Sequence, residues 1–441
     1  MLTAPGASFA ALPYGLPTGN APAYSLTGRF KGVSVAAFHR IRRLLVVLSG
    51  IVAVATPAVG FPGSWAPEHI VIVVLENRSF DQVIGDPHMP YLNSLAKGGA
   101  LMSQAYFAQI PYGIRPTGFG SPLPARPSQP NYLYLFSGHH QGVTPSWVRA
   151  PASPYLGNAT NDVGGDKLPV PFANVAVGIG NRMIPRGWRP FTTPNLGAAI
   201  IASGRSFASF SESLPYPRYD APGDPNPDQD FYRRKHNPAI NWIDLAARSP
   251  SLDKQRFVLP LEANLGFSNT MDPTTGERYR GFAMDANGNA IAFNELPTIS
   301  LVVPNEQHDL HSGDGAACDA WLRTNLKPYA DWARGHHSLL IITFDEDGST
   351  NSSLGDPDAT GIDRIATIIY GSDGKVIPGR YDERIDHLNV LSTILDRYGL
   401  LDQFKRDFLR ANTGLESKAE YSNLRPIRDV FGEGPRLAPL P

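Results

Sequence analysis

Two apolar stretches of the chain, HIVIVVLENRSFD (69–81) and SLLIITFDEDGS (338–349), each end in a group of polar side chains. If both are parallel strands of one sheet, their polar ends meet at the same edge. Carboxylates gathered there repel one another unless a cation lies between them, which indicates an oxygen-rich metal site. The alternative is that the acidic residues only cap the next helix. Capping is the preferred interpretation for either stretch alone, and metal binding is preferred for the two together. The side chains concerned are Glu76, Asn77, Asp345 and Glu346.

Ser128 is the candidate nucleophile. It stands near the start of RPSQPNYLYLFSG (126–138), where a helix could run from Asn131 to Ser137. The N–H groups and dipole at a helix N-terminus favour an incoming phosphate, and a nearby metal ion favours the alkoxide of a serine. An ordinary N-cap serine is the default alternative. Ser137 competes as a nucleophile, although it lies at the far end of the same helix.

A third group of polar side chains follows another apolar run, in VVPNEQHDLHSGD (302–314). Its potential ligands or proton carriers are Asn305, His308, Asp309 and His311. Spacings of three residues within a loop do not fix a metal geometry, so this group alone does not define a metal site. His387, in RIDHLNVL (384–391), leads a predicted helix, where a lone histidine is more often a cap or a surface residue.

Short apolar runs predict the strands that would position these residues. The four runs are Ile70 to Leu75, Ile299 to Val303, Leu339 to Phe344 and Ala366 to Tyr370. A helix is expected from Thr193, as N-cap before Pro194, to Gly204, and another from Asp386 to Tyr398. Alternating strands and helices predict an α/β sandwich with a mostly parallel central sheet and helices on both faces.

The first 58 residues differ in charge from the rest of the chain. The formal net charge is -1, yet residues 1–60 hold five basic side chains and no acidic ones. A basic cluster precedes the apolar run Leu44 to Ala55, the layout of a secretory signal peptide; an uncleaved membrane anchor is the alternative, for which the run is short. We therefore expect a leader with a signal peptide over 1–58, a single domain over 66–441, and a secreted or periplasmic protein.

The composition limits the expected partners and chemistry. A mildly acidic mature chain argues against nucleic acid, and no later segment is apolar enough for a stable membrane span. Cys318 is the only cysteine, so no intramolecular disulfide can form, and we expect a buried structural thiol rather than a nucleophile.

Six segments, taken in order, resemble the bacterial phosphoesterase family that contains phospholipase C and secreted acid phosphatases, a branch of the alkaline phosphatase superfamily. They are VIVVLENRSFDQVIG, RPSQPNYLYLFSG, RRKHNP, VPNEQHDLH, LLIITFDEDGS and DHLNVLSTILDRYGL, spread over residues 70 to 400. The resemblance implies an alkaline-phosphatase-like sandwich, a single phosphoesterase domain and a divalent metal cofactor.

The resemblance also implies roles for particular residues. The catalytic metal would be held by Glu76, Asn77, Ser128, Asp345 and Glu346, with Ser128 also the nucleophile. In relatives, some positions bind a second metal ion or bind and protonate the substrate. These positions match His308, Asp309, His311 and His387. A family segment near the pocket matches His236 and Asn237. Oxygen-rich ligands suit Ca²⁺, Mg²⁺ or Mn²⁺, and Zn²⁺ stays open.

The first expectation is a secreted, metal-dependent acid phosphatase that hydrolyses phosphomonoesters through a phosphoserine intermediate. One of His308, His311 and His387 would protonate the leaving oxygen. The first alternative is a phospholipase C-type phosphodiesterase, whose family members usually carry extra C-terminal β domains that this chain lacks room for. The second is a non-catalytic exported binding protein. The expected partner is a small phosphate ester or a phospholipid head group.

Overall fold

The computed structural model describes most of the chain between residues 65 and 433. The described ranges are 65–110, 114–115, 118–119, 123–124, 128–141, 190–221, 223–225, 231–243, 245, 256–348, 364–412 and 415–433. They fall within one compact unit, Ala58–Pro441. The predicted leader over 1–58 lies outside the described residues.

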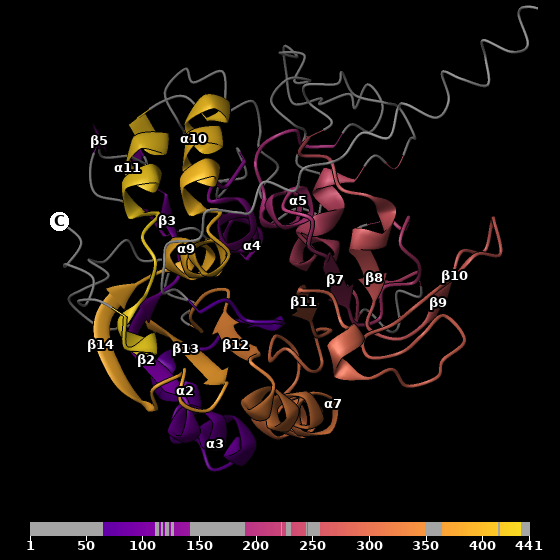
Figure 1. The fold of residues 1–441 in the computed structure, drawn as a ribbon, viewed down its shortest axis with the longest axis horizontal. Helices are drawn as coiled ribbons and strands as arrows, with labels where there is room; N and C mark the ends of the chain where they lie inside the picture. Colours follow the sequence, from indigo (N-terminus) through magenta and orange to yellow (C-terminus); the bar gives the residue numbers. More distant parts are fainter. Residues whose placement is uncertain are drawn as a thin grey trace, which may run out of the picture. The chain divides into compact units, whose positions relative to one another are not determined.

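A central sheet of eight strands has the order β14-β2-β13-β12-β1-β11-β7-β8 (Figure 1). The strands are β1 (Ile70–Leu75), β2 (Ala100–Tyr106), β7 (Phe207–Ser211), β8 (Asn264–Gly266), β11 (Ile299–Val303), β12 (Leu339–Phe344), β13 (Arg364–Gly371) and β14 (Gly379–Ile385). Every neighbouring pair is parallel except the two pairs that β13 makes, with β12 and with β2. The prediction of a mostly parallel sheet is therefore confirmed.

The strand predictions were accurate where the runs are fully apolar. The bounds of β1, β11 and β12 agree with the prediction to the residue. All six residues of β1 are buried, because helices cover both faces of the sheet. The fourth predicted run is also a strand, but it is the antiparallel one, a direction that an apolar run does not encode.

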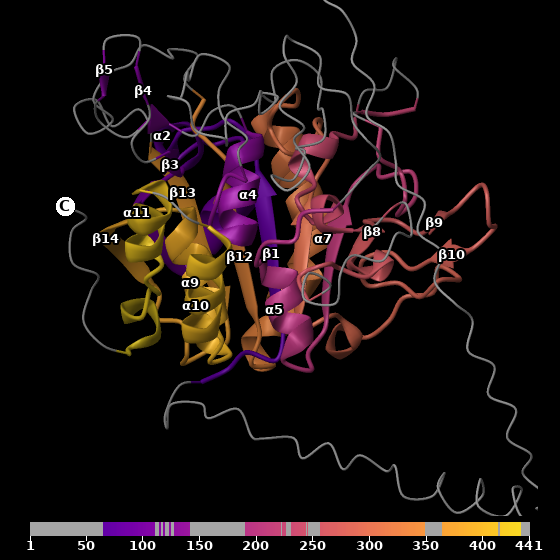
Figure 2. The same ribbon diagram turned by 90° about the horizontal axis from the view of Figure 1, so that it is seen from above.

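Helices lie on both faces of the sheet, as predicted (Figures 1 and 2). On one face α3 (Pro90–Gly98) packs against α7 (Gly315–Gly335), and both contact β13. On the other, α4 (Gln129–Ser137) contacts α5 (Leu196–Ala202) and α9 (His387–Arg397), and α9 contacts α10 (Leu401–Ala411) and α11 (Leu415–Asn423). In the described part of the chain no helix is long and apolar enough to cross a membrane.

The remaining elements are short. They are α2 (Phe80–Val83), the strand pairs β3 (Gln109–Ile110) with β6 (Leu123–Pro124), β4 (Ile114–Arg115) with β5 (Gly118–Phe119) and β9 (Thr270–Met271) with β10 (Arg278–Tyr279), and 3₁₀ turns at Arg234–His236, Ala239–Trp242, Leu261–Ala263, Phe293–Glu295 and Asp429–Phe431. Cys318 is buried in α7, as expected of a structural thiol, and burial raises its pKa.

The predicted start of α5 was wrong by two residues. The N-cap is Asn195, whose side chain accepts a hydrogen bond from the N–H of Ala198. The hydroxyl of Thr193, predicted as the cap, instead donates to Gln141. A carboxamide that reaches the first turn therefore replaces the expected threonine cap. The second predicted helix is α9, with Asp386 as its N-cap.

Candidate active site

Glu76 lies at the centre of a buried hydrogen-bonded group at the carboxyl end of β1. Its side chain is fully buried. Oε2 accepts hydrogen bonds from the Ser128 hydroxyl at 3.0 Å and from the Asn77 amide at 2.9 Å. Oε1 accepts a hydrogen bond from the Tyr132 hydroxyl. One carboxylate therefore joins the turn after β1 to the first turn of α4.

Asp345 emerges beside Glu76 because β1 and β12 are paired in parallel, with Leu75 opposite Phe344. Asn77 adopts a φ of 42°, a left-handed conformation that asparagine tolerates better than most residues. Its main-chain N–H thereby donates to Asp345 Oδ1 at 2.9 Å. Asp345 Oδ2 is buried and has no hydrogen-bond partner among the residues described. The two strand ends thus deliver adjacent carboxylates, one of which keeps an oxygen available.

Ser128 occupies the N-cap position of α4, but its hydroxyl makes no capping hydrogen bond. The hydroxyl instead donates to Glu76, at the end of the helix where the dipole is positive. Ser137 lies at the other end of α4, where its hydroxyl donates to the carbonyl oxygens of Leu133 and His139. Of the two candidate nucleophiles, the acidic group therefore holds Ser128, whereas main-chain oxygens hold Ser137.

Burial raises the pKa of all three carboxylates of this group. Burial, followed by the charges of Asp345 and Asp309, raises the pKa of Glu76 well above its ordinary value. Burial also raises the pKa of Asp309 and of Asp345. Hydrogen bonds to the Asp345 carboxylate partly offset the increase in its pKa. A cation among these oxygens would relieve both the repulsion and the loss of solvation.

His236 completes a cluster of possible metal ligands with Glu76 and Asp309. His236 Nε2 lies 3.2 Å from Glu76 Oε1, without the geometry of a hydrogen bond, and Nδ1 lies 3.7 Å from Asp309 Oδ2. Its ring stacks on Tyr132, with 5.2 Å between centroids. Burial lowers the pKa of His236 well below its ordinary value, so the imidazole is neutral and can ligate. One atom from each of the three residues lies within 4.8 Å of the others, so they could hold a metal ion.

The other predicted histidines lie at different depths. His308 Nδ1 is 2.9 Å from Glu212, and its ring stacks on Trp321. His311 is more exposed, at 36 % of its side chain, and its Nδ1 lies 3.0 Å from Glu306. The ring centroids of His311 and His236 are 6.2 Å apart, which places His311 beside the cluster.

His387 is buried at the end of β12. Its Nε2 lies 2.8 Å from the carbonyl oxygen of Phe344, so Nε2 is the donor and Nδ1 carries the lone pair. Nδ1 has no hydrogen-bond partner in the part of the chain that the structure describes. Burial lowers the pKa of His387 to about 4. A neutral imidazole with an available lone pair suits ligation better than proton donation.

Two further predicted residues contribute through their surroundings. Glu346 is buried, and its contact with the Asp345 carboxylate runs through its main chain. Asn237 is buried behind His236, and its amide donates to Asn264 at 2.7 Å and to the Tyr232 hydroxyl at 3.3 Å. Asn237 therefore fixes the segment that carries His236.

Tyr132 and Lys235 contribute to the group but were not predicted. Tyr132 is one helical turn after Ser128, a spacing that places both side chains on one face of α4, and this spacing was a usable signal. The positive charge of Lys235 lowers the pKa of Glu76 and of Asp309. Lys235 precedes His236 in RRKHNP, and nothing in this sequence pattern predicts that the Lys235 side chain acts on the carboxylates.

The sheet, the buried carboxylates and the serine at a helix N-terminus together define a hydrolase-like α/β site. The Phosphoesterase family model matches residues 87–401, so the chain belongs to this family and acts on phosphoric ester bonds. The phosphatidylinositol-3-phosphatase of Mycobacterium tuberculosis is 32% identical over 403 residues, which cover 89% of this chain and 96% of that protein. The predicted family and enzyme class are confirmed.

Solved structures align less closely. A protein in the alkaline phosphatase superfamily from Vibrio parahaemolyticus is 14% identical, with 76% of this chain and 69% of that chain covered and a TM-score of 0.37. The lipoteichoic acid synthase LtaP from Listeria monocytogenes is 10% identical, with 76% and 72% covered and a TM-score of 0.39. Such scores are too low to define a fold, so the α/β class rests on the sheet and helices described above.

Proposed function

We propose that this chain is a metal-dependent phosphomonoesterase, of the acid phosphatase type, that uses Ser128 as its nucleophile. One observation supports this role most strongly. The Ser128 hydroxyl lies at the N-terminus of a helix yet donates its hydrogen bond to a buried carboxylate, Glu76, rather than to the helix. A serine placed between the positive end of the helix dipole and an acidic group can receive a phosphate and release its hydroxyl proton.

The side chains around Ser128 fit a divalent cation. Asp345 and Asp309 each keep a buried carboxylate oxygen without a hydrogen-bond partner among the described residues, and His236 approaches Glu76 without bonding to it. Glu76, Asn77 and Asp345 would hold the ion, with Asp309 and His236 within reach. Bound there, a divalent ion supplies positive charge against a non-bridging phosphate oxygen. The oxygen donors favour Ca²⁺, Mg²⁺ or Mn²⁺, and the imidazole also admits Zn²⁺.

The proposed reaction has two displacements at phosphorus. In the first, a bond forms between Ser128 Oγ and phosphorus while the ester P–O bond breaks and the leaving oxygen takes a proton. Glu76, which accepts the hydrogen bond of the Ser128 hydroxyl, is the proposed acceptor for the Ser128 proton. In the second, a water oxygen bonds to phosphorus, the bond to Oγ breaks, and Ser128 regains a proton, which releases inorganic phosphate.

His311 is the proposed proton donor to the leaving group. It lies beside the cluster, is partly exposed, and is held by Glu306. His308 is directed toward Glu212, and His387 is neutral above a pH of about 4. A histidine acid acts in its protonated form, which favours turnover at acid pH.

We propose a phosphomonoester as the substrate, and the relative from Mycobacterium tuberculosis supports one carried on an inositol lipid. Release of inorganic phosphate should be measured from a chromogenic phosphomonoester and an inositol lipid monophosphate, and release of the phosphorylated head group from a choline phosphodiester, over a range of pH. We expect turnover of the monoesters, fastest at acid pH. Turnover of the diester alone would replace the proposal with a phospholipase C-type activity, and no turnover of any ester with metal supplied would indicate a binding protein.

Ser128→Ala should reduce phosphomonoester hydrolysis by at least about 10³-fold, because the nucleophile is lost. Ser137→Ala is the matched control, since it removes a buried hydroxyl from the same helix without touching Glu76. We expect Ser137→Ala to stay within about tenfold of the unmodified protein. The measurement is the initial rate of phosphomonoester hydrolysis by the folded, metal-loaded variants. An active Ser128→Ala beside an inactive Ser137→Ala would move the nucleophile to Ser137.

We also propose that the protein is exported, as the leader-like composition of residues 1–58 supports. Expression of the full chain in a bacterial host, followed by N-terminal sequencing of the recovered protein, tests this. We expect recovery from the periplasm or medium with an N-terminus near residue 58. Full-length protein confined to the cytoplasm would contradict export.

A further inference from the structure

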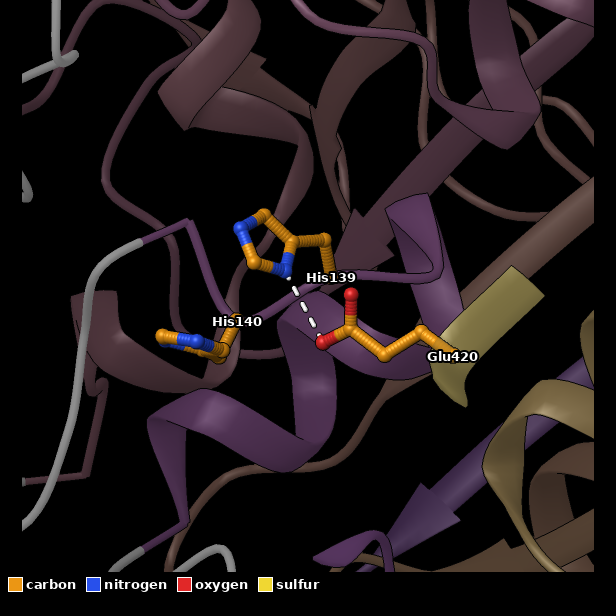
Figure 3. A group of neighbouring side chains, drawn as sticks. All are labelled: His139, His140 and Glu420. Carbon is orange, nitrogen blue, oxygen red and sulfur yellow. Dashed lines mark hydrogen bonds and ion pairs between the residues drawn. The ribbon is translucent and has the colours of Figure 1, made fainter. Parts of the chain in front are cut away.

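A second cluster of buried ligand-type side chains lies at the opposite end of α4 from Ser128. His139 and His140 follow Gly138, which ends the helix with a φ of 74°, and Glu420 projects from α11 (Figure 3). His139 Nδ1 is 2.9 Å from Glu420 Oε1, and the two imidazole centroids are 4.5 Å apart. One ligand atom from each of the three residues lies within 4.8 Å of the others. All three residues are buried.

The second carboxylate oxygen of Glu420 supports a cation in this cluster. Glu420 is 2% exposed, and its Oε2 has no hydrogen-bond partner among the described residues. Leaving a carboxylate oxygen buried and unpaired is costly, because it has lost its hydration without a replacement. A cation bound by this carboxylate would remove that cost.

The position at the end of α4 also favours a positive charge. The last carbonyl groups of a helix carry a partial negative charge that stabilises cations. The nine residues of α4 separate this end from Ser128 by about 14 Å along the helix axis. The cluster is therefore distinct from the acidic group around Glu76 and is not needed to build it.

Two imidazoles and one carboxylate are a characteristic donor set for Zn²⁺. Zinc binds histidine nitrogen and carboxylate oxygen at about 2.0–2.2 Å in a tetrahedral arrangement, in which neighbouring ligand atoms are about 3.3 Å apart. The separation of 2.9 Å between His139 and Glu420 needs to widen by only a few tenths of an ångström. Ca²⁺ and Mg²⁺ prefer oxygen donors, so the two imidazoles disfavour them.

We propose that His139, His140 and Glu420 bind a zinc-type divalent ion that fastens α11 to the end of α4. Two protein nitrogens, one carboxylate and one water would complete four-coordination. Because the ligands come from residues that are about 280 positions apart in the chain, binding would stabilise the folded state over the unfolded chain. The site goes beyond the proposed hydrolysis and does not depend on it.

Zinc binding to the full-length protein tests this proposal. The protein is stripped with a chelator and dialysed against Zn²⁺ alone, and bound zinc is counted by elemental analysis. His140→Gln is the decisive variant because it leaves the hydrogen bond between His139 and Glu420 in place. Glu420→Gln is the second variant, and Glu76→Gln is the control for the acidic group around Ser128.

We expect His140→Gln and Glu420→Gln each to bind one equivalent of zinc less than the unmodified protein, whereas Glu76→Gln keeps this equivalent. Zinc should raise the melting temperature of Glu76→Gln, and this rise should be absent when His140→Gln is added to it. Circular dichroism shows whether His140→Gln and Glu420→Gln are folded. If one of them does not fold, the zinc content of the other tests the proposal. Equal zinc content in the unmodified protein and folded His140→Gln would overturn the proposal and leave only a hydrogen bond between His139 and Glu420.

Discussion

At the scale of single residues, Glu76 connects most of the candidate active site. Its two oxygens accept hydrogen bonds from Asn77, in the turn after β1, and from Ser128 and Tyr132 of α4. Each donor fixes the carboxylate in one orientation, and a fixed carboxylate is what a metal ion and a nucleophile both require. Removing one donor without disturbing packing therefore tests the importance of this orientation.

Tyr132→Phe removes the hydroxyl that donates to Glu76 and keeps the ring that stacks on His236. Burial and the charge of Glu76 hold the pKa of Tyr132 well above its ordinary value, so the hydroxyl stays protonated and donates. A hydrogen bond to a charged group contributes about 1.5–3 kcal/mol, so we expect kcat/KM to fall about 10- to 100-fold. Phosphomonoester kinetics at saturating metal provide the measurement.

Tyr91→Phe is the matched control for Tyr132→Phe. The Tyr91 hydroxyl is buried on α3, on the other face of the sheet, and has no hydrogen-bond partner within the described ranges. We expect its removal to leave kcat/KM within about twofold. If Tyr132→Phe were as active as Tyr91→Phe, the hydroxyl would have no part in orienting Glu76.

At the scale of elements, the sequence was most informative where a single strand or helix carries the pattern. The apolar runs fixed β1, β11 and β12 to the residue, because a fully buried strand needs apolar side chains on both faces. The antiparallel direction of β13 depends on how it pairs with β2 and β12, which no local pattern encodes. The start of α5 depends on which of several polar side chains reaches the first turn.

The start of α9 carries two buried groups whose pKa values shift in opposite directions. Burial raises the pKa of Asp386 to about 6, so the folded protein holds a proton there that the unfolded chain releases near pH 3.8. Stability from this group falls as pH rises from about 4 to about 6. Burial lowers the pKa of His387 from 6.5 to about 4, so its contribution is lost as pH falls through the same range. In the unmodified protein the two effects oppose each other.

Replacing either group should reveal the effect of the other. Compared with the unmodified metal-free protein, the free energy of unfolding of His387→Asn should decrease between pH 4 and pH 6, by at most about 3 kcal/mol. That of Asp386→Asn, which keeps a capping residue, should increase over the same range by the same comparison. Denaturant titrations at several pH values give both slopes. If both variants differed from the unmodified protein in the same direction, the opposed shifts of Asp386 and His387 would be contradicted.

At the scale of the whole molecule, the candidate site combines parts that are distant in sequence. The sequence predicted that Glu76 and Asp345 meet, because parallel strands end at one edge of a sheet. The family resemblance placed His236 near the pocket, but no local pattern predicted its approach to Glu76 and Asp309, since the path of the intervening chain sets that distance. Long-range placement of loops is therefore the part of the site that local patterns do not contain.

The raised pKa values of Glu76, Asp309 and Asp345 predict that protons compete with the metal. Burial is the main cause of all three shifts, so the carboxylates bind protons at a higher pH than exposed ones. These protons must leave before a cation binds, so the affinity for Mn²⁺ should increase with pH. Calorimetric titration of Glu420→Gln in buffers of different ionisation enthalpy should detect proton release. Affinity that does not change with pH, without proton release, would contradict the buried carboxylates as ligands.

The most direct test of the central claim is chemical trapping of the phosphoserine. The metal-loaded protein is mixed with a labelled phosphomonoester and quenched in acid within the first turnover, and mass spectrometry locates any phosphate on the chain. We predict one phosphate per molecule on the peptide that contains Ser128, absent from Ser128→Ala and still present in Ser137→Ala. Rapid hydrolysis with no phosphorylated peptide, or phosphate on another residue, would contradict the assignment of Ser128 as the nucleophile.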